Sequence, residues 1–74
     1  MKVTIKLFAT LRNQRFKVDI QEFAEAVTVL NIVEKLGIDR EELAIVLVNG
    51  QDVALEHMLS DGDVLALFPP VGGG

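Results

Sequence analysis

The amino-acid sequence predicts an α+β fold in which a mixed sheet of four to five strands packs against one main helix. Three features support this class: alternating apolar and polar residues near both ends of the chain, a helical apolar stripe between them, and tight-turn sequences that separate the segments. Because the chain has only 74 residues, it has room for one small domain. We place that domain at residues 1–68 and an extended flexible C-terminal tail at residues 69–74.

The N-terminal segment predicts an antiparallel hairpin. Strands at 2–7 and 15–20 each alternate between apolar and polar residues, and a polar break at 10–14 separates them. The apolar residues of the two strands are Val3, Ile5 and Leu7, followed by Phe16, Val18 and Ile20. Because each strand also has a polar face, one side of the hairpin is expected to be solvated.

One helix is predicted after an irregular link at 21–27. Thr28 is a good N-cap residue, and Gly37 can end the helix as a C′ residue with positive φ. The apolar stripe between them consists of Val29, Ile32, Val33 and Leu36. Asp39 with Glu42 resembles a capping box, which predicts one more short helical turn.

The rest of the domain predicts two strands and a short return segment. A continuously apolar strand at 44–48 precedes Asn49-Gly50, a hairpin turn dipeptide, and the segment 52–55 is a candidate to pair back. A turn at 61–63 leads to the last strand at 64–68, which Pro69 and Pro70 end. Met58 and Leu59 are interpreted as core residues beneath this turn. This order of elements is that of a ubiquitin-like β-grasp roll.

The composition excludes several classes of function. The absence of Cys excludes disulfides, thiolate catalysis and Cys-based zinc sites, and the net charge of -4 argues against nucleic acid or an anionic membrane as the principal partner. No apolar run approaches the ~20 residues of a membrane span, and we expect no signal peptide and a cytoplasmic location. His57 is interpreted as a loop residue, so no metal or bound cofactor is expected. We expect no activity from the chain alone.

The composition of the C-terminal segment indicates a role other than stabilisation of the fold. It has no charge from residue 64 onward, and it ends in Pro69-Pro70-Val71-Gly72-Gly73-Gly74. Prolines favour extended backbone and glycines add no stability to a small domain, so we expect an arm that reaches about 20 Å. Its working group would be the carboxylate of Gly74. That carboxylate is ionised and needs activation, for example by attack on the α-phosphate of ATP, before a sulfur or nitrogen nucleophile displaces AMP.

Strand parity predicts a partner surface beside this arm. If Leu7 and Leu67 face the core, Phe8 and Phe68 face outward, and neighbouring first and last strands would place both rings in one apolar patch. Such patches usually mark partner surfaces, although a local contact that seals the sheet edge is the alternative. Arg12 is interpreted as a surface loop arginine, with a partner or phosphate contact as its alternative.

The ending Phe68-Pro69-Pro70-Val71-Gly72-Gly73-Gly74 resembles the Phe-Pro-Pro-Val-x-Gly-Gly ending of the small subunit of molybdopterin synthase, the MoaD family of ubiquitin-like sulfur carriers. The resemblance spans nearly the whole chain. Its weaker matches are Leu7-Phe8-Ala9 with Leu11-Arg12, Thr28-Val29, Val48-Asn49 and Asp61-Gly62-Asp63. Asp52 departs from the apolar residue that some members have after the hairpin turn.

The resemblance implies a cycle of loading and unloading. A ubiquitin-activating-type adenylyltransferase would use Mg-ATP to adenylate Gly74, and a sulfur donor would convert the adenylate to a thiocarboxylate. The large subunit of molybdopterin synthase would then accept the tail, and sulfur would pass to a pterin precursor of the molybdenum or tungsten cofactor. Gly72 and Gly73 would give channel access. The implied docking contacts are Phe8, Phe68, Pro69, Pro70 and Val71.

Other functions remain open from the sequence. The chain could be a ubiquitin-like modifier that is conjugated to lysines through Gly74, or a sulfur carrier for thiazole synthesis in the thiamine pathway. A non-catalytic β-grasp binding module with an idle tail is the alternative from a different class.

Overall fold

A computed structural model describes residues 1–70 of the chain. The elements follow one another as β1 (Lys2–Leu7), the 3₁₀ turn η1 (Ala9–Arg12), β2 (Val18–Glu22), α1 (Val29–Lys35), the 3₁₀ turn η2 (Arg40–Glu42), β3 (Ile45–Val48), β4 (Gln51–Asp52) and β5 (Val64–Phe68). The five strands form one sheet in the order β2-β1-β5-β3-β4. In this sheet β1 and β5 are parallel, and the other three pairs are antiparallel.

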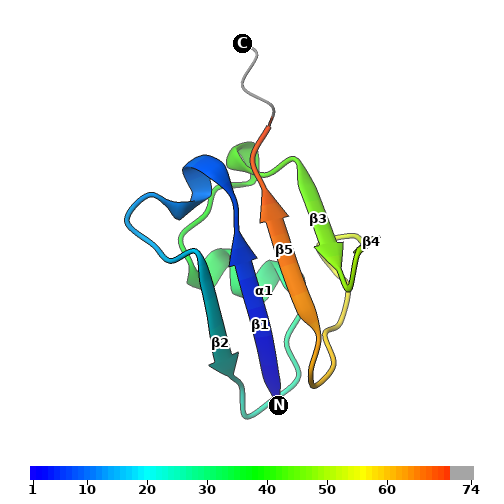
Figure 1. Ribbon diagram of the computed structural model, residues 1–74. Coiled ribbons are helices and arrows are strands. Elements are labelled where there is room, and N and C mark those ends of the chain that lie inside the picture. The colour runs from blue at the N-terminus through cyan, green and yellow to red at the C-terminus, as the bar shows by residue number, and fades with distance from the viewer. Residues whose placement is uncertain (71–74) are drawn as a thin grey trace.

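The sheet has one covered face and one open face. Helix α1 lies across one face, and no other helix of residues 1–70 covers the opposite face (Figure 1). This mixed sheet with a single helix confirms the predicted ubiquitin-like β-grasp fold. We call the uncovered side the open face. No helix within residues 1–70 is both long and apolar enough to span a membrane.

The core lies between α1 and the inward side chains of the sheet. Inward residues of the two central strands are fully buried, as the predicted parity requires. The residues without solvent exposure in these three elements are Val3, Ile5, Leu7, Leu65, Leu67, Val29 and Ile32. Because burial of each such side chain contributes about 1.5–3 kcal/mol, this layer supplies most of the stability of the domain.

The predicted ends of α1 are confirmed. The Thr28 hydroxyl accepts a hydrogen bond from the Asn31 backbone N–H, and the Asn31 side chain accepts one from the Thr28 N–H, which is a reciprocal capping box. At the other end Gly37 has φ of 71°, and Ile38 N–H donates to the Val33 carbonyl at 3.1 Å. This is a Schellman C-cap, which requires the left-handed residue that Gly37 provides.

The second capping box was predicted wrongly. The short turn η2 is present, but the Asp39 side chain makes no capping hydrogen bond. The backbone closes this turn instead, because the Glu42 N–H donates to the Asp39 carbonyl at 2.9 Å. A single 3₁₀ turn leaves few free N–H groups, so it forms without a side-chain cap.

The second strand differs most from its prediction. It covers Val18–Glu22 rather than 15–20, and the link begins after it. Its register pairs Val18 with Lys6 and Ile20 with Thr4, so Val18 and Ile20 lie on the open face with 50% and 64% of their surface exposed. Phe16 packs on the core from the loop before the strand. Although Val18 and Ile20 follow it at intervals of two residues, they lie on the opposite side, because the strand begins only after this loop.

The turn dipeptide Asn49-Gly50 forms the predicted hairpin. Both residues have positive φ, 52° and 82°, as a type I′ turn requires. The returning strand is shorter than the candidate segment 52–55, because only Gln51 and Asp52 pair with β3.

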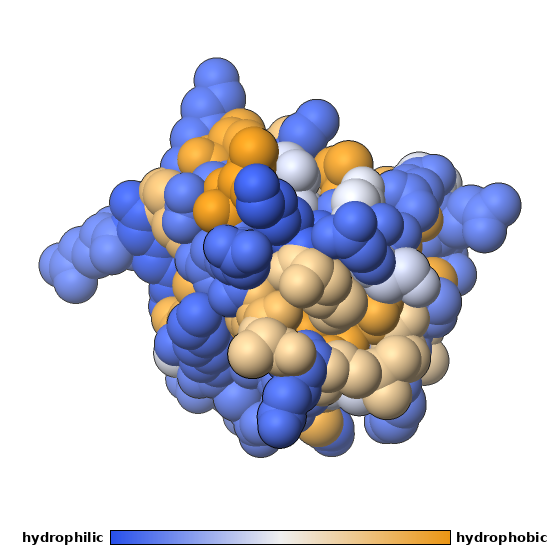
Figure 2. Space-filling model, turned by 90° about the horizontal axis from the view of Figure 1, so that it is seen from below, coloured by the Kyte–Doolittle hydropathy of each residue, from blue (hydrophilic) through white to orange (hydrophobic). Residues whose placement is uncertain are grey.

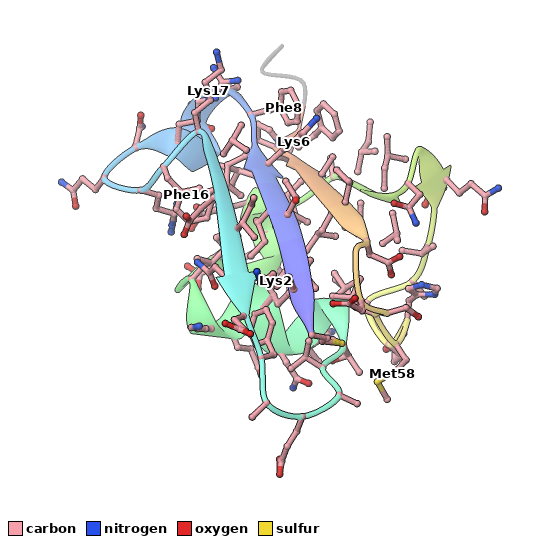
Figure 3. All side chains as sticks on the ribbon, turned by 60° about the horizontal axis from the view of Figure 1, so that its bottom comes forward. Lys2, Lys6, Phe8, Phe16, Lys17 and Met58 are labelled. Carbon is pink, nitrogen blue, oxygen red and sulfur yellow. The ribbon has the colours of Figure 1, made fainter. Side chains whose placement is uncertain are left out.

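The end of the domain opposite Phe68 carries an exposed apolar area, which Figure 2 shows in orange and tan among hydrophilic residues. Met58, at this end in Figure 3, is 55% exposed, so its assignment to the core was wrong. Leu59 is buried as predicted, at 3%. Met58 lies in extended backbone, where it forms an isolated antiparallel bridge with Thr28, and successive side chains of such backbone alternate between two sides.

Arg15 joins the loop after η1 to the end of α1. Its Nε donates to the Leu36 carbonyl at 3.0 Å, and Nη2 donates to the Gly37 carbonyl at 3.1 Å. Nη1 donates to the Leu11 carbonyl at 3.1 Å. All three nitrogens of the guanidinium are therefore bound to backbone carbonyls, two of them at the helix C-terminus, where a cation is favourable.

We expect Arg15→Lys to lower the free energy of unfolding by about 1–2 kcal/mol, because an ammonium keeps the charge but cannot reach three separated carbonyls. Urea denaturation measures the change. The control is Arg40→Lys on exposed η2, which should change stability by less than about 0.5 kcal/mol. Equal stability of Arg15→Lys and the wild type would contradict this assignment.

Candidate functional site

The two central strands end side by side where the C-terminal tail begins. Because β1 and β5 are parallel, Leu7 and Leu67 are register partners at the same end of the sheet. The Phe8 N–H extends the ladder by donating to the Leu67 carbonyl at 3.2 Å. After Phe68, the half-buried Pro69 and the exposed Pro70 lead away from the sheet. The start of the tail is thus anchored to the end of β1.

Phe8 and Phe68 stack directly against each other. Their ring centroids lie 4.2 Å apart and the ring planes differ by 11°, and both residues are half-buried. The prediction that parity and strand neighbourhood bring the two rings together is confirmed. The role of the rings in docking stays a prediction.

Ile45 extends this aromatic pair across the sheet. It is the register partner of Phe68 in β3 and is 42% exposed. We call Phe8, Phe68 and Ile45 the tail-exit patch. The exposure of Ile45 was not predicted from the sequence, because a continuous apolar run such as 44–48 predicts burial on both faces of a sheet. Antiparallel pairing of β3 with β5 would have revealed it.

A second row of the open face lies below the tail-exit patch. The register places Val18, Lys6, Ala66, Leu47 and Asp52 side by side across all five strands. Lys6 in the central strand β1 and Asp52 in the edge strand β4 are charged, and the other three residues of this row are apolar. The row therefore places apolar side chains between two opposite charges next to the tail-exit patch.

Positive charge lies beside the tail-exit patch. Lys6 precedes Phe8 on the outward side of β1, as Figure 3 shows, and Arg12 ends η1. The Arg12 guanidinium carbon lies 5.4 Å from the centroid of the Phe8 ring, within the range of a cation–π contact. The electrostatic character of this side of the patch is therefore cationic, although the chain as a whole has a net charge of -4.

The other predicted residues have simpler surroundings. His57 is exposed, and residues 1–70 contain no cluster of His, Cys, Asp and Glu side chains that could hold a metal ion. Asp61 and Asp63 act as turn formers: Asp61 accepts from the Lys2 N–H at 2.7 Å, and Asp63 accepts from the Ser60 N–H at 2.8 Å. The predictions for Val71, Gly72, Gly73 and Gly74 lie outside the described residues.

The described residues form no pocket, so the candidate site is a surface patch next to the start of the tail. The fold is that of the ubiquitin-like sulfur carriers. Over residues 5–74 the chain matches the model of the ThiS family, and it belongs to that family. No curated protein sequence matches the chain.

Solved structures with this fold include several related proteins. SAMP1, the small archaeal modifier protein 1 of Haloferax volcanii, is 28% identical with a TM-score of 0.78, and the match covers 100% of both chains. A Pyrococcus furiosus protein assigned as subunit 1 of molybdopterin converting factor is 31% identical over 96% of this chain and 99% of its own, with a TM-score of 0.75.

A chain in the Amycolatopsis orientalis BexX/CysO complex is 32% identical, with a TM-score of 0.66. The match covers 97% of this chain and 99% of that chain. The resemblance to a family of ubiquitin-like sulfur carriers is therefore confirmed. The names of these similar proteins point to different roles, so the fold alone does not define the role of this chain.

We expect the Phe8–Phe68 stack to couple the two residues energetically. In a double-mutant cycle with Phe8→Leu and Phe68→Leu, the interaction energy should be about 0.5–1.5 kcal/mol, measured by urea unfolding. Phe23 packs beside Lys35 of α1, on the covered side of the sheet. The control cycle of Phe8→Leu with Phe23→Leu should be additive within about 0.5 kcal/mol. Additivity in the first cycle would show that the rings do not stabilise each other.

Proposed function

We propose that this chain carries sulfur as a thiocarboxylate on Gly74 and delivers it to a pterin precursor as the small subunit of molybdopterin synthase. The observation that carries the proposal is the stacked Phe8–Phe68 pair at the point where the sequence continues into Pro-Pro-Val-Gly-Gly-Gly. A rigid apolar surface next to a narrow backbone arm is suited to docking outside an enzyme while the arm enters it.

The loading chemistry needs no side chain of this protein. A carboxylate oxygen of Gly74 attacks the α-phosphorus of ATP, the bond to the β-phosphate breaks, and pyrophosphate leaves. Hydrosulfide then attacks the acyl carbon, the bond from that carbon to the phosphate-bound oxygen breaks, and AMP leaves with that oxygen, so that Gly74 ends in a thiocarboxylate. The activating enzyme supplies the Mg-ATP site, and the docked body holds the carbonyl in place.

Two findings support this proposal over a plain binding module. The match to the ThiS family extends through residue 74, so it includes the glycine sequence rather than the folded body alone. The Pyrococcus furiosus protein, whose assignment names molybdopterin converting factor, is 31% identical over nearly the full length of both chains. The Phe-Pro-Pro sequence at the start of the tail is the feature that favours the pterin pathway.

The test of loading is intact-protein mass spectrometry. Incubation with an activating enzyme from the same organism, Mg-ATP and sulfide should add the mass difference of one oxygen-to-sulfur exchange, located at Gly74 by fragmentation. A variant without Gly73 and Gly74 should remain unmodified, with its unfolding free energy within about 0.5 kcal/mol of the wild type. An unchanged wild-type mass with a demonstrably active enzyme, or a natural protein that continues beyond Gly74 without processing, would contradict the proposal.

Conjugation to proteins is the second candidate function. It is favoured by the similarity to the small archaeal modifier protein 1, at 28% identity over nearly the whole chain. A modifier would leave its C-terminal glycines joined to lysine side chains of other proteins after digestion. We expect no such isopeptide remnants in extracts of the source cell, and we expect the thiocarboxylate form instead. Remnants that depend on Gly74 would favour the modifier.

A further inference from the structure

The loop between β1 and β2 contains two arginines with different uses. The side chain of Arg15 gives all three guanidinium nitrogens to backbone carbonyls. The side chain of Arg12 gives only Nε, which donates to the Leu7 carbonyl at 2.7 Å. Among residues 1–70, Nη1 and Nη2 of Arg12 have no acceptor. Within residues 1–70, every nitrogen of the Arg15 guanidinium therefore donates a hydrogen bond, whereas the two terminal nitrogens of Arg12 donate none.

Two contacts fix the position of the Arg12 guanidinium. The Nε bond holds it at the end of β1, and its carbon lies 5.4 Å from the Phe8 ring centroid. Its backbone is held as well, because the preceding Leu11 is fully buried. The side chain is half-buried in this arrangement. A long side chain that is already ordered loses less entropy on binding than a free one.

The free end of this guanidinium suits a planar anion. Nη1 and Nη2 form a pair of parallel donors that matches a carboxylate or a phosphate. If the tail is extended, Gly74 lies about 20 Å from the tail exit, so nucleotide phosphate at the reacting carbonyl is beyond the reach of Arg12. A carboxylate on the surface of a docked protein, by contrast, can lie within the reach of Arg12. Lys6, outward on β1, adds positive charge on the same side.

We propose that Arg12 recognises the protein that accepts the tail, by a bidentate contact from Nη1 and Nη2 to a carboxylate beside the apolar surface that covers Phe8 and Phe68. This inference rests on the proposed function, because the activating enzyme is the first such acceptor. Arg12 acts in docking, so it determines affinity and orientation and takes no part in the chemistry at Gly74.

The test is ATP–pyrophosphate exchange by the activating enzyme at varied concentrations of the full-length carrier. Arg12→Gln removes the charge and one pair of donors, and we expect the KM for the carrier to rise at least ~10-fold with kcat within about twofold. Arg12→Lys keeps the charge without the paired donors and should give an intermediate KM. The wild-type KM should rise more steeply with salt than the KM of Arg12→Gln.

The control is Lys35→Gln, which removes one positive charge from α1 on the other side of the sheet and should leave KM unchanged. Thermal unfolding verifies that each variant is folded. If Arg12→Gln does not fold, the KM of Arg12→Lys compared with that of the wild type tests the proposal. Equal KM values for the wild type and the Arg12 variants would overturn the role of Arg12 while leaving the carrier function intact. If wild-type carrier supports no exchange, both the proposed function and this inference are wrong.

Discussion

The parallel pairing of β1 with β5 is the constraint on which the rest of the structure depends. Parallel strands finish at the same end of a sheet, so the pairing brings the end of β1 to the beginning of the tail. It also places Leu7 and Leu67 together in the core and Phe8 and Phe68 together outside. Because side chains alternate, a shift of β5 by one residue would turn Leu67 outward and Phe68 inward, and the pair with Phe8 would be lost. The core and the contact surface are therefore fixed by one register.

The sequence contained enough information to predict much of the fold. The central strands, the helix caps and the Asn49-Gly50 turn depend on local patterns, and the structure confirms them. The register of β2 does not depend on a local pattern. Phe16 joins the core from the loop, after which Val18 and Ile20 turn outward, and only the pairing with β1 reveals this change of phase. Met58 was misplaced for the same reason, since its bridge partner Thr28 is distant in sequence.

The candidate site was predictable to the extent that it follows from parity. Phe8 and Phe68 could be assigned to one patch once their strands were taken as neighbours. Ile45 required the additional knowledge that β3 flanks β5 on the other side. The difference between Arg12 and Arg15 was beyond sequence reasoning, because both are loop arginines in a polar segment and only the carbonyls around them distinguish their uses. Such contacts depend on where a loop folds back, which side-chain periodicity does not encode.

The small size of the domain explains why outward residues determine its specificity. This chain of 74 residues builds a single core, and its described part has no pocket in which to bind a substrate. If proteins share this core and a glycine-rich ending, their different specificities for partners can arise only from the outward residues of the sheet and from the loops beside it. In this chain those positions combine stacked aromatic rings with a cation that the fold has oriented and left partly unused. Under the proposed function, discrimination between a pterin pathway and protein conjugation would depend on which acceptor complements this surface, since activation of a terminal glycine would be common to both.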